Sequence, residues 1–476
     1  MTARVLAVAT LLFGTFLAAA QTGSTQYSYI DIDKAAPLVE FENSRLTRIS
    51  GGVEIVLRGA DESVRPMQLE AQEIAFTWSD QGNSPTTINL NESVRVDSPQ
   101  GDIRSARAVL DLNGGVLTFT GSVSGTSEQI TSFEADEIVY DLDSGDSEMI
   151  NLRAAGIGLG GGEGDVSAPD SGYSEMDIDR AGAVKFVDGQ VETMSGGVSI
   201  TLQPAQANAQ RLKLGASTVG IAWAPSGQPA AIQMRGSVRV DGPQGDIRSE
   251  KADLNLGKKT LEFTGNVKGT TEQIEAFDTD TLTYNLDSGD TLMTNLRAQG
   301  LDIGQPEPEG ESGEEESASP FTKMDIEKAP EVSMTAGTLN WMRGGVQIRI
   351  HGREEDAPPL TLDASELTFA YSEGATSPDR VVMTGDVVVD GPSTDITSDT
   401  AELNMASNTL TFTGNVKGSQ PGLTGATARR VVYDLVTGNM SMQGTSIREM
   451  DHRRMNEETD KTEAETTEAD AGSAPQ

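Results

Sequence analysis

The chain has 476 residues, a formal net charge of −38 and 36% apolar residues. This length is enough for about three domains of ordinary size. Nucleic acid is an unsuitable partner, because a phosphate backbone is bound by clustered Lys and Arg, and the 35 cationic residues form no such cluster among 73 acidic ones. The chain contains no cysteine, which excludes disulfides, thiolate metal sites and cysteine nucleophiles.

The amino terminus resembles a secretory signal peptide. Arg4 is followed by the apolar run Val5–Ala20, which ends in small residues and passes into a polar segment. We therefore predict a signal peptide over residues 1–20, with a mature chain outside the cytoplasm that has no transmembrane span. An uncleaved anchor is the alternative, although the run is short for a bilayer.

One stretch of sequence occurs three times. Val94–Ser105 (VRVDSPQGDIRS) returns as Val238–Ser249 and, with more changes, as Val387–Ser398, and each copy is followed by a similar LTFTG segment. Such a period predicts three copies of one structural unit. The predicted segments are unit 1 at 27–157, a Gly-rich linker at 158–172, unit 2 at 173–303, an acidic linker at 304–320, unit 3 at 321–447 and a charged, disordered tail at 448–476.

Inside each unit, apolar residues fall at every second position over short runs, as in Ile74, Phe76 and Trp78 or Leu117 and Phe119. This period indicates short strands with one apolar face. Turn sequences separate the runs at intervals of about 8 to 12 residues, which leaves no room for crossover helices. The predicted fold class is therefore all-β, with antiparallel sheets.

The acidic segment Asp141–Asp146 (DLDSGD) has the look of a calcium loop, and its twin is Asn285–Asp290. The third copy, Asp434–Asn439, keeps the glycine and loses most carboxylates. We therefore interpret the motif as a hairpin turn whose glycine adopts positive φ, with an ion site as the alternative. The PQGD sequences around Gln100 and Gln244 are interpreted as turns in the same way.

No catalytic or metal-binding residue is predicted, and no cofactor. The two histidines, His351 and His452, are interpreted as solvated, so no Ser-His-Asp triad is available. The protein is therefore expected not to be an enzyme. A glycosidase that uses two of the many carboxylates is the enzymatic alternative.

A recurring pattern carries a family resemblance. The sequence T-G-[NS]-V, as in Thr264–Gly269 and Thr413–Gly418, is followed by a strand of the form seen in Ala135–Gly145 (ADEIVYDLDSG). This pattern resembles the OstA-like family of lipopolysaccharide-transport proteins, which includes LptA and the periplasmic domain of LptD. The resemblance implies a periplasmic protein of open, twisted two-sheet jelly-roll units, known as a β-taco. It also implies that lipid A acyl chains travel in an apolar slot and that edge strands join neighbouring transport components, without covalent chemistry.

Under this resemblance the protein is a carrier or bridge for lipopolysaccharide or a similar lipid in outer-membrane biogenesis. The alternative is a structural or surface-interaction protein of stacked β units with a filled core and no lipid ligand. Three units in one chain and the strong acidity depart from the family pattern. The predicted lipid-binding residues are the inward-facing aromatics Phe76, Trp78, Phe119, Tyr140, Trp223, Phe263, Tyr284, Phe369, Phe412 and Tyr433.

Overall fold

The structure is a computed structural model of the whole chain. It describes residues 27–34, 37–59, 61, 64–79, 84–98, 101–127, 129–159, 172–206, 210–271, 273–303, 321–352, 359–375, 377–391, 394–420, 423–447 and 449–450. The predicted signal peptide, nearly all of both predicted linkers, His452 and the tail beyond Met450 lie outside these residues, as does Gln100.

The described residues form strands and turns and no helix, so this part of the chain holds no apolar helix of membrane-spanning length. The predicted all-β class is confirmed. The strands are β1 (Tyr27–Lys34), β2 (Leu38–Glu42), β3 (Arg45–Gly59), β4 (Met67–Trp78), β5 (Pro85–Ser98), β6 (Gly101–Asp111), β7 (Val116–Ser127), β8 (Ile130–Asp141), β9 (Ser147–Gly158), β10 (Tyr173–Val187), β11 (Gln190–Pro204), β12 (Leu212–Trp223), β13 (Pro229–Gly242), β14 (Gly245–Asn255), β15 (Thr260–Thr270), β16 (Ile274–Asn285), β17 (Thr291–Asp302), β18 (Phe321–Thr335), β19 (Thr338–Gly352), β20 (Leu360–Ala370), β21 (Arg380–Gly391), β22 (Thr394–Asn404), β23 (Thr409–Gln420), β24 (Leu423–Asp434), β25 (Met440–Gln443) and β26 (Glu449–Met450).

The chain divides into two compact units, Met1–Arg235 and Gly236–Gln476, which we call the N-terminal unit and the C-terminal unit. The boundary falls inside β13 rather than at either predicted linker. In the N-terminal unit β9 pairs with β10, with Ile157 opposite Met176. In the C-terminal unit β17 pairs with β18, with Leu301 opposite Met324. Backbone hydrogen bonding therefore crosses both predicted linker positions.

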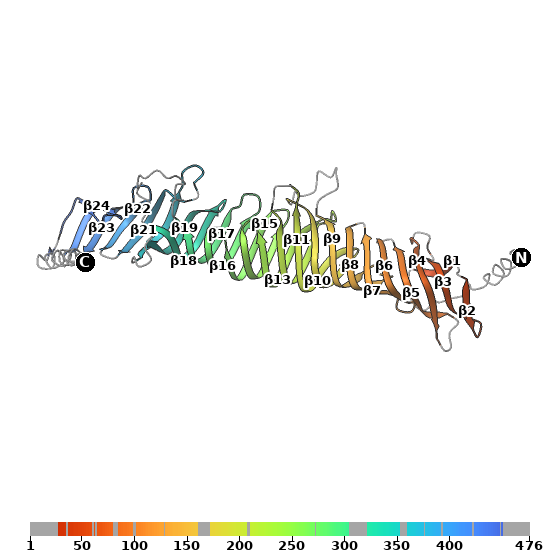
Figure 1. Ribbon diagram of the computed structural model, residues 1–476. Coiled ribbons are helices and arrows are strands. Elements are labelled where there is room, and N and C mark those ends of the chain that lie inside the picture. Colours follow the sequence, from red (N-terminus) through yellow and green to blue (C-terminus); the bar gives the residue numbers. More distant parts are fainter. Residues whose placement is uncertain are drawn as a thin grey trace, which may run out of the picture. The chain divides into compact units, whose positions relative to one another are not determined.

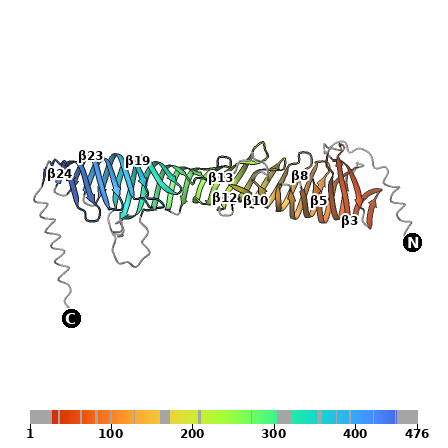
Figure 2. The same cartoon turned by 90° about the horizontal axis from the view of Figure 1, so that it is seen from above.

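Within each unit the long strands lie side by side in the order of the sequence, and the described pairings inside the units are antiparallel (Figures 1 and 2). The short strands β1 and β2 both pair with β3, and β25 and β26 both pair with β24. Most consecutive long strands form hairpins, and a long strand inside a unit uses both edges to bond its two sequence neighbours. This arrangement satisfies the backbone donors and acceptors of the inner strands.

Most long strands are interrupted near the middle by a bend, where the register shifts. In β7 the shift lies between Thr120 and Val123, and the two residues between them, Gly121 and Ser122, have φ of 81° and 51°. An added Cβ on Gly121 would lie 2.9 Å from the Cβ of Ala106, so the position requires glycine. The T-G-[NS]-V motif is therefore the sequence of a bend, in which a β-bulge turns the strand.

The bends are aligned between neighbouring strands. Asn91 of β5 pairs with Arg107 of β6, which pairs with Thr120 of β7, and Thr120 pairs with Glu137 of β8. We call the half-strands on the two sides of a bend its arms. Because the bends are aligned, they follow one edge of the folded sheet, and the hairpin turns at the arm ends follow the other edge, here called the hairpin edge.

The apolar faces of both arms form the core. Leu117 and Phe119 are fully buried on the first arm of β7, and Val123 is buried on the second arm. The predicted short strands need a correction. Ile88 and Val96, for example, belong to one 14-residue strand, β5, because the Asn-Glu-Ser sequence between their runs is a bend and not a chain reversal. Single strands therefore contribute to both arms.

Candidate functional site

A cavity of about 210 Å³ lies between the two arms of the N-terminal unit, and we call it the unit cavity. Both arms of β7 contribute to it, through Phe119 and Thr126, and both arms of β8 contribute through Phe133 and Tyr140. The lining residues are Met67, Val96, Ser98, Gly101, Ile103, Leu117, Phe119, Thr126, Ser127, Gln129, Ile130, Phe133, Ile138, Tyr140, Gly145, Ser147, Met149, Phe186, Asp188 and Gly189.

Apolar and polar lining residues of the unit cavity are separated. Leu117, Phe119 and Ile138 are essentially inaccessible to solvent. The polar members, such as Ser127, Gln129 and Asp188, stand at or next to strand ends and are exposed or half-buried. The cavity therefore has an apolar interior and a polar mouth at the hairpin edge, as ligand pockets with a few orienting polar groups do.

The DLDSGD segment forms the turn between β8 and β9 at this mouth. The Asp141 Oδ1 accepts hydrogen bonds from the backbone N–H groups of Asp143 and Ser144, both at 2.9 Å, and Gly145 has φ of 77°. These backbone hydrogen bonds lower the pKa of Asp141 below its usual range. The predicted hairpin turn with a positive-φ glycine is thus confirmed.

The twin segments make the same turn. Asn285 Oδ1 accepts the N–H groups of Asp287 at 2.9 Å and Ser288 at 3.0 Å. Asp434 Oδ1 accepts those of Val436 and Thr437. The side chain at the first position is retained because it caps its own turn.

The predicted turn at Gln244 is also present, between β13 and β14. Gly245 has φ of 104°, and a Cβ there would lie 2.0 Å from the Thr270 carbonyl oxygen. The predicted solvated His351 is partly exposed, and its Nε2 lies 2.8 Å from the Asp325 Oδ2, so it has a carboxylate partner.

Two of the ten predicted lipid-binding residues, Phe119 and Tyr140, line the unit cavity. Tyr140 is 6% exposed, and its burial raises the pKa of the phenol well above its usual range, with the nearby Tyr27 and Asp141 adding to the effect. Its hydroxyl is therefore neutral at every physiological pH, and it presents a polar but uncharged group to the cavity.

The two predicted tryptophans, Trp78 and Trp223, do not line the unit cavity. The indole Nε1 of Trp78 donates to the Leu46 carbonyl oxygen, and that of Trp223 donates to the Val191 carbonyl oxygen, both at 2.7 Å. Each ring therefore fastens a strand end to the preceding strand. Tyr371 follows β20 at the corresponding place, and burial raises its pKa to about 12. Phe76 is half-buried on the same strand as Trp78.

The remaining predicted residues lie in the C-terminal unit. Phe263, Tyr284, Phe369 and Phe412 are buried there, and Tyr433 is half-buried. They do not line the unit cavity.

Sequence reasoning missed several lining residues, among them Ile130, Phe133, Met149 and Phe186. A signal for some of them was present, because Val123, Phe133 and Ala135 are buried on the far side of a bend. Interpreting the bend as the end of a strand hid this continuation.

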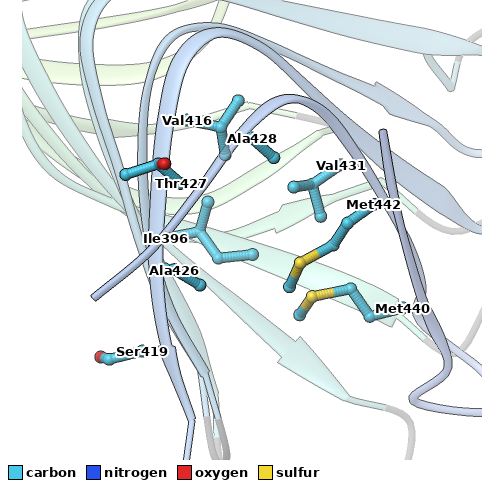
Figure 3. Close-up of a pocket in the computed structure, with 10 residues that line it drawn as sticks. Ile396, Val416, Ser419, Ala426, Thr427, Ala428, Val431, Met440 and Met442 are labelled. Carbon is cyan, nitrogen blue, oxygen red and sulfur yellow. The ribbon is translucent and has the colours of Figure 1, made fainter. Parts of the chain in front are cut away.

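A second pocket lies near the end of the C-terminal unit and measures only about 10 Å³. Figure 3 shows Ile396, Ala426 and Val431 around it, with the side chains of Met440 and Met442 extending toward them. Met440 and Met442 come from β25, which pairs with β24. The space between the arms is thus nearly filled here by two flexible thioether side chains.

The unit cavity offers apolar contacts, hydroxyls, one amide and one carboxylate. Among its lining residues there is no Lys, Arg or His, and the described residues hold no cluster of three His, Cys, Asp or Glu placed to bind a metal ion. The arrangement is suited to holding an apolar chain. No protein-family model matches this sequence, and the search of curated proteins gives no match either.

Proposed function

We propose that the protein is a non-enzymatic, periplasmic lipid-binding protein that holds an acyl chain in the unit cavity. The observation that carries this proposal is an apolar cavity of about 210 Å³, lined by Phe119 and Tyr140, whose mouth lies at the hairpin edge. Apolar interiors of β architectures are known hosts for such ligands.

The volume sets the size of the ligand portion inside. A cavity of about 150 Å³ lined by Leu, Ile and Phe stays dry and binds benzene. The unit cavity is moderately larger, so it suits a segment of one acyl chain rather than several chains together. Each buried methylene contributes about 0.8 kcal/mol, before the entropy of immobilising the chain is subtracted.

The finer proposal is the one that the family resemblance implies. Arms joined at bends and separated at a hairpin edge support an OstA-like β-taco, in three repeated units, that carries lipopolysaccharide by its acyl chains. Exposed apolar side chains on the edge strand β2, Leu38 at 52% and Phe41 at 57%, support strand addition by another transport component.

A photo-crosslinking amino acid tests the lipid proposal. Placed at Phe119 in the mature chain it should capture a lipid detected by mass spectrometry, whereas at Thr118, on the other face of β7, it should not. A second position, Ser127 at the mouth, avoids disturbing the buried core. Capture from Thr118 alone, or no capture from either Phe119 or Ser127, would contradict the proposal.

The second candidate is a structural or surface-interaction protein with a filled core. The observation in its favour is the C-terminal unit, where Phe263 and Phe412 are fully buried and the pocket near β25 measures about 10 Å³. Native mass spectrometry separates the two functions. A bound lipid in the purified protein supports lipid binding. The mass of the protein alone, together with no binding of added lipid, supports the structural or surface-interaction function.

A further inference from the structure

The mouth of the unit cavity is acidic. Asp188, in the turn between β10 and β11, lines the cavity directly. Its backbone N–H donates to the Asp146 Oδ1 at 3.4 Å, which brings the β8–β9 turn beside it, and Asp143 is exposed on that same turn. The carboxylates of Asp188 and Asp146 therefore stand at the place where the head group of a bound amphiphile would lie.

Two nearby basic side chains are paired with carboxylates. Lys185 lies 2.7 Å from the Glu192 Oε2, and Arg95 lies 3.5 Å from the Asp102 Oδ2. Neither lines the cavity. Lys185 also interacts with Asp146, and both Glu192 and Asp146 raise its pKa. The carboxylates of Asp188, Asp146 and Glu192 outnumber this one cation, so the potential at the mouth stays negative and falls off over about 8 to 10 Å at ordinary ionic strength.

The polar lining can still bind a head group by hydrogen bonds. The Ser127 Oγ accepts the N–H groups of Gln129 at 3.3 Å and Ile130 at 3.1 Å, so its own hydroxyl proton can be donated outward. Gln129 is exposed and adds an amide with both donors and acceptors. Hydroxyl or amide groups on a ligand would find partners here.

We infer that the unit cavity takes one alkyl chain of an amphiphile whose head group carries no negative charge. This inference rests on the proposed function, because it requires that an acyl chain enters the cavity. It departs from the finer proposal at this cavity, because lipopolysaccharide is an anionic lipid. Two negative charges in contact at a protein surface repel each other even though water partly screens them. An anionic head group such as a phosphate is therefore disfavoured beside Asp188 and Asp146.

The chain itself supplies a comparison for Asp188. The corresponding turn between β18 and β19 has Ala336, and the two residues have φ of 50° and 48°. Alanine is thus accommodated in the same left-handed conformation. Asp188→Ala therefore removes the charge and keeps the backbone conformation of the turn.

Glu148 is a matched control. It lies on β9 between Ser147 and Met149, which both line the cavity, but it is exposed on the opposite face of the strand. Glu148→Ala also removes one negative charge, but it changes no residue that lines the cavity.

The test uses the full mature chain loaded with the uncharged fluorescent probe N-phenyl-1-naphthylamine, displaced at low salt and below micelle formation. We expect 1-O-dodecylglycerol to displace the probe at a concentration about 10-fold lower than dodecyl phosphate does. The gap should shrink to about 3-fold in Asp188→Ala and in high salt, and should persist in Glu148→Ala.

The outcomes separate the two proposals. Equal potency of the two amphiphiles, or equal effects of the two substitutions, would overturn the head-group inference while the displacement itself upholds lipid binding. If the probe does not bind, or neither amphiphile displaces it, both proposals fail.

Discussion

The two pockets described here arise from one kind of architecture and differ about twentyfold in volume. In the N-terminal unit the space between the arms is about 210 Å³, and near β25 of the C-terminal unit it is about 10 Å³. In both, buried aliphatic residues of one arm face the other. The difference lies at the strand ends, where the larger cavity has Gly145, Ser147 and Gly189 and the smaller has Met440 at the position of Ser147. Met442 corresponds to Met149, which lines the larger cavity.

This comparison teaches that the bent sheet does not itself make a ligand site. The backbone sets two apolar faces opposite each other, and interiors of proteins are normally packed to the density of organic crystals. A cavity persists only where small and polar residues at the hairpin edge leave the space unfilled. The proposed ligand binding therefore depends on a few side chains, which substitutions can test.

The largest expected effect is a loss of stability when the equivalent phenylalanines of β7 and β23 are replaced by alanine. Phe412→Ala should lower the free energy of unfolding of the C-terminal unit by about 3 to 5 kcal/mol. Phe119→Ala should lower that of the N-terminal unit by about 3 kcal/mol, since Phe119 borders an existing cavity and loses fewer contacts.

Urea denaturation followed by tryptophan fluorescence measures these changes unit by unit, because Trp78 and Trp223 lie in the N-terminal unit and Trp341 in the other. A Trp341→Phe background isolates the first signal. A larger loss from Phe119→Ala than from Phe412→Ala would contradict the difference in packing.

The second prediction is that the small pocket near β25 can be enlarged into a cavity like that of the N-terminal unit. Replacing Met440 and Met442 together by alanine should open the space between the arms and lower stability by about 2 kcal/mol, since both residues are only half-buried. A new binding site for N-phenyl-1-naphthylamine should appear, measured by titration. The Met→Leu pair, which nearly conserves volume, should gain no site. An alanine pair that binds no probe would show that other residues close this region.

The third effect is a pH dependence of the N-terminal unit that depends on Tyr140. The raised pKa of Tyr140 means that its stabilising contribution is complete below the pKa of about 10 of an unfolded tyrosine. It is lost as the pH rises above that value, because the unfolded chain ionises first.

Stability of the N-terminal unit should therefore fall above pH 10 by up to about 1.4 kcal/mol per pH unit from this group. Tyr140→Phe should flatten that part of the curve, as measured by urea midpoints between pH 9 and 11.5. A slope that the substitution leaves unchanged would assign the alkaline loss to other groups.

The smallest effect concerns a bend. In β5 the two left-handed positions are Glu92 and Ser93, whereas β21 of the C-terminal unit has Gly385 and Asp386 at the same place. Glu92→Gly should raise the free energy of unfolding by about 0.5 to 1 kcal/mol, because glycine adopts positive φ without steric strain. Asp97→Gly, on an extended part of β5, should lower it by a similar amount. If both substitutions destabilise equally, the bend does not strain Glu92.

Much of the fold could be predicted, because a period of two reports directly which side of a strand meets the core. Leu117 and Phe119, or Leu410 and Phe412, were assigned to the apolar face from spacing alone, and both pairs are buried. The turn at Asp141 was predictable for a local reason. A side chain that caps its own backbone needs no distant partner.

The bends and the cavity were harder to predict. Gly121–Ser122 has the composition of a chain reversal, and only pairing across several strands shows that the strand continues beyond the bend into its second arm. The cavity depends on the distance between two arms, which no local pattern records. Asp188 and Tyr140 come to the cavity from different hairpins, so no local pattern links them. Tyr140 could be predicted because it belongs to a repeated motif, whereas Asp188 could not.

The bends have a consequence for how such a chain folds and grows. Inside each unit a long strand bonds mainly to the strands just before and just after it, so most pairings close loops of one hairpin. A protein built this way behaves as a quasi-one-dimensional array, in which stability accumulates between nearest neighbours and folding can begin at any hairpin. A hairpin pair gained or lost by recombination would change the length of the array by two strands and leave the alignment of the remaining bends intact.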